Sequence, residues 1–200
     1  MQGMNLDKTQ VARRQLGTAL ALFIDDLDPV SVHTLACAGG EIAEHLTRKA
    51  GATPFVTHAM SAIPDLTINE IRLLQNQFWN SFKHATTRKG EERADHELLK
   101  RFNDSQNDHT LFVGWYDYVL AIGTMPPEGQ AFQAWYFALY PEKINPEFDG
   151  SSFDLIFPDL RKCSRAEQKA RLRDAIEKTR SDSAIMSDTR TDKSELCLRD

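Results

Sequence analysis

Apolar side chains recur at helical spacing along most of this 200-residue sequence. No segment shows the alternation of apolar and polar residues that is typical of a half-buried strand. The helical pattern covers the ranges 6–25, 29–50, 67–88, 105–122 and 126–140, with a shorter stretch at 94–102 and a charged one at 165–179. We therefore expect an all-α fold, a helical bundle of about five core helices with a helical C-terminal extension.

Capping residues and glycines support these helix predictions. Asp28 followed by Pro29 is typical of a helix N-cap and first helical position. Thr67 and Glu70 have the spacing of a capping box, which predicts the start of another helix. Gly39 and Gly40 stand inside a predicted helix, where glycine costs stability, so we expect another helix to approach closely there.

The chain divides by composition into two parts. Residues 1–140 hold most of the apolar pattern and form the predicted bundle core. Residues 141–200 form an extension with one charged helix and a polar, weakly patterned tail that we expect to be extended. Aromatic and apolar side chains at Phe148, Phe153, Ile156 and Phe157 are expected to tuck onto the bundle.

Charge and cysteine content restrict the class of protein. Lys and Arg number 24 against 29 Asp and Glu, a net charge of −5 that disfavours non-specific duplex binding. The three cysteines form no Cys-x-x-Cys pair, which argues against a disulfide framework or a zinc knuckle. No apolar run approaches the ~20 residues of a membrane span, and no signal peptide is evident. We expect a cytoplasmic chain without a membrane partner or cofactor.

One predicted helix carries a polar column. A column forms when residues recur every four positions, and here it consists of Arg72, Asn76, Asn80 and His84, with Lys83 beside it and Trp79 at its edge. Asn, His and basic side chains supply donors and acceptors for a phosphate, a ribose or a flipped base. A plain solvated helix face is the alternative, because every amphipathic helix has one.

The segment 76–85, with Asn76, Asn80, Lys83 and His84, resembles the helix end of HEPN-like helical proteins. That resemblance implies a small helical bundle that dimerises and, in many members, a metal-independent endoribonuclease. Its motif places an Arg shortly before a His, and the His corresponds to His84. The nearest Arg before His84 in this chain is Arg72, which lies outside that window.

The residues themselves indicate the same chemistry. Metal-free RNA cleavage needs a base for the 2′-hydroxyl and a cation for the phosphate. His84 suits the first role, while Lys83, Arg72 or Arg88 suits the second. We expect a homodimer that handles RNA or a nucleotide through this face. The alternative is a non-enzymatic module whose helix faces and C-terminal arm bind a protein partner.

Two further groups have structural and functional interpretations. A second stripe, His33, Cys37, Glu41 and His45, holds metal-binding residue types, but its spacing fits known sites loosely, so we predict no metal. Asp117 lies in an apolar helix and is either a buried acid or, as we prefer, a structural partner of a Lys, Arg or Tyr hydroxyl.

Overall fold

The computed structural model describes residues 6–62, 65–143 and 150–198. These residues form ten α-helices and two short 3-10 turns and contain no strands beyond two isolated β-bridges. The all-α prediction is confirmed. The helices are α1 Lys8–Ile24, α2 Pro29–Lys49, α3 Phe55–Ala62, α4 Ile68–Lys83, α5 His96–Leu99, α6 Gln106–Ile122, α7 Pro127–Leu139, α8 Ser151–Ile156, α9 Arg165–Ser181 and α10 Ser183–Ser187.

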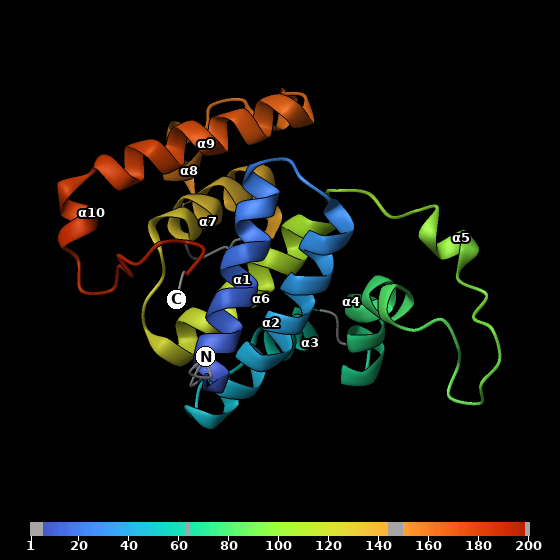
Figure 1. The fold of residues 1–200 in the computed structure, drawn as a ribbon. Helices are drawn as coiled ribbons and strands as arrows, with labels where there is room; N and C mark the ends of the chain where they lie inside the picture. The colour runs from blue at the N-terminus through green and yellow to red at the C-terminus, as the bar shows by residue number, and fades with distance from the viewer. Residues whose placement is uncertain (1–5, 63–64, 144–149, 199–200) are drawn as a thin grey trace, which may run out of the picture.

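The centre of the bundle is α2, which packs against both α1 and α6 (Figure 1). The predicted close approach at the glycine pair is confirmed. A Cβ on Gly40 would lie 3.5 Å from the Cα of Gly114 in α6, and one on Gly39 would lie 2.8 Å from Leu16 in α1. Small residues at this crossing let three helix backbones come together, which offsets the conformational cost of glycine.

One hydrophobic core runs through the described chain. It contains fully buried aromatic rings from α1, α6 and α7, at Phe23, Trp115, Phe132 and Trp135. The C-terminal part joins the same core through buried Leu160, Leu172, Ile176 and Leu196. Residues on both sides of position 140 therefore share one interior.

The helix starts follow the expected capping chemistry. Asp28 accepts hydrogen bonds from the backbone of Val30 and Ser31, with Pro29 at the first helical position. Thr67 and Glu70 form a reciprocal capping box at α4. Both predicted starts are therefore confirmed, and each satisfies backbone N–H groups that have no partner within the helix.

Several boundaries differ from the sequence prediction. Residues 52–66 fall between the predicted helical ranges, yet they contain the eight-residue helix α3. Phe157 is buried as expected, whereas Ile156 is 56% exposed, so its predicted burial is wrong. Phe148 lies outside the described residues.

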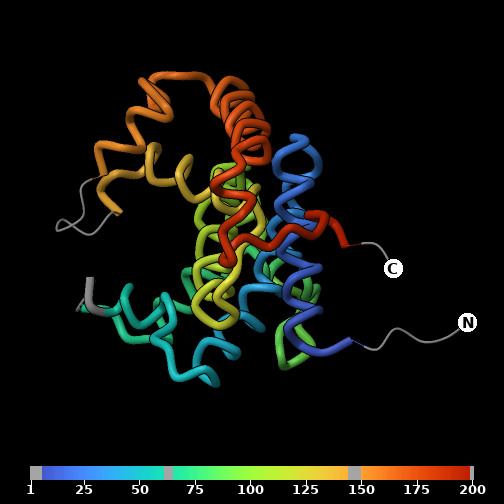
Figure 2. Tube along the Cα trace, turned by 90° about the vertical axis from the view of Figure 1, so that its left-hand side faces the viewer, coloured from blue at the N-terminus to red at the C-terminus, as the bar shows by residue number. Residues whose placement is uncertain are grey.

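The tail was expected to be extended from residue 180 onward, but α9 continues to Ser181 and residues 183–187 form α10, so the expectation is wrong there. Residues 188–198 are not helical, and they are docked on the bundle. Figure 2 shows this segment crossing α1. Arg13 of α1 donates to Asp192 and to the backbone carbonyls of Glu195 and Leu196.

Candidate functional site

The predicted polar column lies on α4, at one flank of the bundle (Figure 1). The inner face of α4 buries Ile71 and Phe78. Arg72 contacts Glu44 near the end of α2, and the Phe82 ring lies 5.7 Å from that of His33 near its start. The two helices are therefore antiparallel, and the outer face of α4 is open.

Arg72 is engaged with α2. Its Nη2 donates to Glu44 Oε1 at 2.5 Å, and Arg48 donates to the same oxygen at 2.8 Å. Although burial opposes it, these two guanidinium groups hold the pKa of Glu44 below its usual value. Arg72 thus stabilises the α2–α4 contact and shares the Glu44 carboxylate with Arg48.

Lys83 and Trp79 form a pair at the other end of α4. Lys83 Nζ lies 3.5 Å from the centre of the Trp79 ring, a cation–π contact. Lys83 is exposed and Trp79 is half-buried. The half-buried amides of Asn76 and Asn80 make no side-chain hydrogen bond within the described part of the chain. Four of the predicted residues thus lie on α4.

His84 departs from the predicted column. It caps α4 in an extended conformation, with φ −128° and ψ 114°, and its side chain is exposed. The expected continuation to residue 88 is wrong because the next residues form a hairpin turn. There Thr87 N donates to Glu91 O at 2.7 Å and Arg93 N donates to Ala85 O at 3.2 Å. These backbone bonds replace the helical ones.

The structure does not bring Arg72 and His84 together. Twelve residues separate them, which at ~1.5 Å per helical residue corresponds to about 18 Å. A single phosphate cannot contact both side chains within one copy. The cations closest to His84 in sequence are instead Lys83 and, at the tip of the hairpin, the exposed Arg88 and Lys89.

His33, the first residue of the second stripe, has a structural role. Asn107 donates its amide to Pro29 O, so its Oδ1 accepts from His33 Nδ1 at 3.0 Å. His33 therefore carries a proton on Nδ1, and burial lowers its pKa. Burial also raises the pKa of the Cys37 thiol to about 12.

Glu41 and His45 are exposed on the same stripe. No group of three or more potential ligands is arranged for a metal ion among the residues described.

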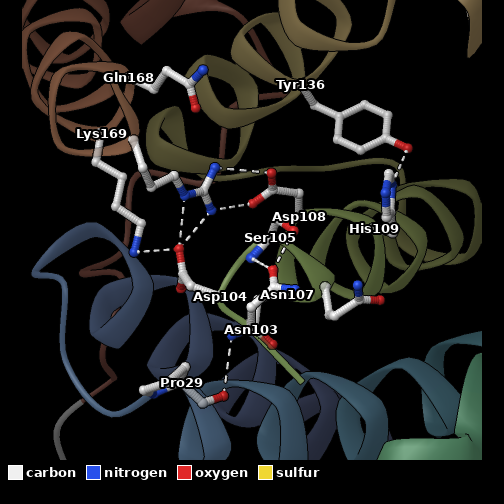
Figure 3. A network of polar contacts seen from close by, with 12 residues as sticks. Pro29, Asn103, Asp104, Ser105, Asn107, Asp108, His109, Tyr136, Gln168 and Lys169 are labelled. Atoms are coloured by element: carbon white, nitrogen blue, oxygen red, sulfur yellow. Dashed lines mark hydrogen bonds and ion pairs between the residues drawn. The ribbon is translucent and has the colours of Figure 1, made fainter. Parts of the chain in front are cut away.

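A partly buried ion-pair network was not predicted from the sequence (Figure 3). Arg165 at the start of α9 donates to both oxygens of Asp108, at 3.0 and 2.6 Å, and also to Asp104. Lys169, only 1% exposed, contacts Asp104 at 2.9 Å and Asp26 at 2.7 Å. We name Asp26, Asp104, Asp108, Arg165 and Lys169 the α9 clamp.

The α9 clamp is saturated by its own charges. Burial raises the pKa of Asp108, while hydrogen bonds from Arg165 and Tyr140 oppose that shift. Nothing near Asp104 or Asp108 in the sequence indicates these pairs, because their partners lie about sixty positions further along the chain. Each cation faces a carboxylate, so the clamp joins α9 to α6 and to the α1–α2 loop.

Asp117 has a structural partner, as preferred, but not the kind predicted. Its Oδ1 accepts from the backbone N–H of Phe55 at 2.8 Å, at the first residue of α3. Burial raises the pKa of Asp117 to about 6. No Lys, Arg or Tyr hydroxyl supplies a hydrogen bond to it within the described chain, so the carboxylate acts as a cap for α3 from a neighbouring helix.

A surface pocket of about 410 Å³ lies between α7, α8, α9 and α10. Its lining includes Ala131, Ala134, Phe157, Arg171 and Lys178. None of the predicted site residues lines this pocket.

Comparison with protein-family models, curated proteins and solved structures finds no match to the chain. Within the described ranges, no helix combines the length and apolarity needed to cross a membrane.

Proposed function

We propose that the chain handles single-stranded RNA through the basic end of α4, defined as Trp79, Lys83, His84, Arg88 and Lys89. The observation that carries this proposal is the juxtaposition of a half-buried indole with exposed cations at one helix end. An aromatic side chain beside basic ones is the combination that binds single-stranded nucleic acid, because bases stack and phosphates pair with cations.

The local charge balance favours a weak and salt-sensitive contact. Glu91 and Glu92 are exposed on the return limb of the hairpin, and the whole chain carries a net charge of −5. Few phosphates are then neutralised, so affinity depends on stacking, which contributes ~1–3 kcal/mol per base. This balance favours unpaired RNA over a duplex.

Cleavage is the enzymatic form of this proposal. In that form, His84, which is exposed, takes the 2′-hydroxyl proton, and Lys83 precedes it in the chain. Arg72 is about 18 Å away along the helix, so it does not share a phosphate with His84 in one copy. A dimer that faces two basic ends toward each other would supply the second cation, as the HEPN-like resemblance implies.

The binding experiment uses the tryptophans of the chain. Trp115 and Trp135 are completely buried, whereas Trp79 is half-buried, so RNA that stacks on Trp79 changes the fluorescence of that residue alone. We expect an unstructured oligoribonucleotide to quench this emission at low salt. Trp79→Phe should abolish the response, and Lys83→Ala should weaken binding. Lys49→Ala is the control, because Lys49 is exposed at the end of α2.

Cleavage is measured on the same RNAs in EDTA. Loss of cleavage in a folded His84→Ala variant would assign the base. Binding without cleavage would leave an RNA-binding module, and no response by either measurement would refute the proposal.

A second candidate function rests on a different face of α4. Leu73 and Leu74 are adjacent on α4 and are 64% and 57% exposed. Two adjacent exposed leucines favour a protein-binding surface, the non-enzymatic alternative. Replacing both leucines by Ser should abolish partner binding or self-association while leaving the RNA response intact. If it does not, the leucine face has no such role.

A further inference from the structure

The C-terminal arm, defined as residues 188–198, saturates a buried cation on α1. Arg13 is only 3% exposed, and its Nε donates to Asp192 Oδ2 at 2.8 Å. Its Nη1 and Nη2 donate to the carbonyl oxygens of Leu196 and Glu195 at 2.9 and 3.2 Å. Each guanidinium nitrogen therefore meets an acceptor from the arm, and removal of the arm would leave a buried charge without these partners.

The surface beneath the arm is shaped for an extended peptide. The Leu196 side chain is 6% exposed, and a Cβ on Gly17 would lie 2.2 Å from the Leu196 carbonyl oxygen. Further along, Met125 N donates to Arg190 O and Asp192 N donates to Met125 O, both at 3.0 Å. We name the surface formed by Arg13, Gly17 and Met125 the arm groove. It recognises peptide backbone by direct pairing and close approach.

The joint between the arm and the bundle is exposed. Asp182 alone separates α9 from α10, with φ −79° and ψ 112°. Its side chain caps α10 by accepting from Ala184 N and Ile185 N. No residue of α10 is buried. Rotation at Asp182 would therefore release α10 and the arm, withdrawing Leu196 from the core and leaving the buried residues of α9 in place.

We propose that the arm also docks on the arm groove of a second copy, so that two chains associate by exchanging their C-terminal arms. The contacts made between copies are the same as those made within one, so exchange introduces no new interface chemistry. The arm brings a carboxylate and backbone carbonyls, while the groove brings a guanidinium, so the charges are complementary. This inference is independent of RNA binding.

The ratio of closed monomer to exchanged dimer depends on the protein concentration relative to the effective concentration of the tethered arm. A short tether gives the arm of the same chain an effective concentration in the millimolar range. An arm that is free only about one-thousandth of the time at an effective concentration of ~1 mM binds the groove with a Kd near 1 μM. Exchange then becomes measurable once the intramolecular contact is removed.

Two variants of the 200-residue chain remove that contact from opposite sides. Arg13→Ala damages the groove and keeps the arm, whereas the double change Asp192→Ala, Leu196→Ala damages the arm and keeps the groove. Each variant alone should be a monomer of 22.7 kDa by light scattering. An equimolar mixture should form a heterodimer of twice that mass, because the intact arm of one chain meets the intact groove of the other. The control mixture pairs Arg13→Ala with Lys193→Ala, a change at an exposed arm residue, in place of the variant with the damaged arm. It should give far less heterodimer, because the groove of the Lys193→Ala chain is already filled by its own arm.

The outcomes separate cleanly. A mixture that stays monomeric to about 1 mM, well above the expected Kd, overturns the proposal. Dimers of either variant alone also overturn it, because neither variant holds an intact arm and an intact groove. If Arg13→Ala loses its helical circular dichroism, Gly17→Ala replaces it, since its new methyl group blocks the groove while the guanidinium is retained.

Discussion

Gly17→Ala should change the stability of this protein in opposite directions with and without the C-terminal arm. In an ordinary helix interior, Ala is more favourable than Gly by about 1 kcal/mol. With the arm in place, the new Cβ would stand 2.2 Å from the Leu196 carbonyl oxygen and 2.6 Å from Arg13 Nη1. Ordinary contact begins near 3.4 Å, so the arm must shift by about 1.2 Å.

The shift has an estimated cost. Overpacking of this kind costs ~1–3 kcal/mol, and weakening one hydrogen bond to the Arg13 guanidinium costs a further ~1.5–3 kcal/mol. Subtraction of the helical gain leaves about 1.5–5 kcal/mol. A docked-to-free ratio of ~1,000 makes arm docking worth about 4 kcal/mol, so we expect a net loss of about 1.5–3 kcal/mol in the free energy of unfolding. The cost cannot exceed the free energy of arm docking, because the arm can simply leave.

The assay compares four chains by urea unfolding, followed by far-UV circular dichroism. They are the 200-residue chain and a chain shortened to end at Ser187, each with and without the substitution Gly17→Ala. In the shortened chain the substitution should stabilise by up to about 1 kcal/mol, because the obstructing carbonyl is gone. Gly40→Ala is the control, since its Cβ would meet only Gly114, at 3.5 Å, and its effect should not depend on the arm.

The sign of the change in unfolding free energy in the two chains tests this reasoning. If Gly17→Ala stabilises both chains by the same amount, the arm does not press on α1 in solution and the reasoning fails. Equal destabilisation of both chains would point to a conflict within the bundle instead of with the arm.

Three other substitutions test separate contacts. Asp117 has a raised pKa of about 6, so the folded state holds its proton more tightly than the unfolded state, and stability from this group falls as pH rises from about 4 to 7. The difference in unfolding free energy between the wild type and Asp117→Asn should shift by up to ~3 kcal/mol over that range in urea titrations, and a flat difference would contradict the burial argument. Arg165→Met should cost about 3 kcal/mol by urea unfolding, because it leaves the fully buried Asp108 without its main partner, and adding Asp108→Asn should recover part of the loss. Thr67→Ala removes the cap of α4 and should cost ~1 kcal/mol, seen as faster amide exchange confined to that helix.

Local features of the sequence predicted the helices well. The Asp28–Pro29 start and the Thr67–Glu70 capping box depend on neighbouring residues alone, and both form as expected. The paired Gly39 and Gly40 also predicted a close helix crossing, because glycine inside a helix needs a compensating contact. Features whose cause lies within a few residues were accessible from the sequence.

The candidate site was predicted less completely, because its geometry depends on where α4 ends. Helical periodicity continues past Lys83, but the hairpin that pairs Ala85 with Arg93 takes over the backbone bonds. His84 therefore leaves the column that the spacing predicted. Arg72 kept its place on the helix, yet its pairing with Glu44 of α2 is a tertiary contact that spacing along one helix cannot reveal.

The α9 clamp and the arm groove show the same limit over longer distances. Arg165 and Asp108 are separated by 57 positions, and Arg13 and Leu196 by 183. A charged residue next to an ordinary helix start carries no indication of a partner so far away. Such pairs become visible only when the packing of the helices is known.

The separation of Arg13 from its acceptors also has a consequence for synthesis of the chain. The ribosome adds Leu196 183 residues after Arg13. At ~5–20 residues per second, the guanidinium waits about 10–40 s for the carbonyls that satisfy it. The contacts of Arg13 are thus completed only after the rest of the bundle has been made. A message that ends before the codon for Asp192 yields a protein in which Arg13 lacks its acceptors from the arm.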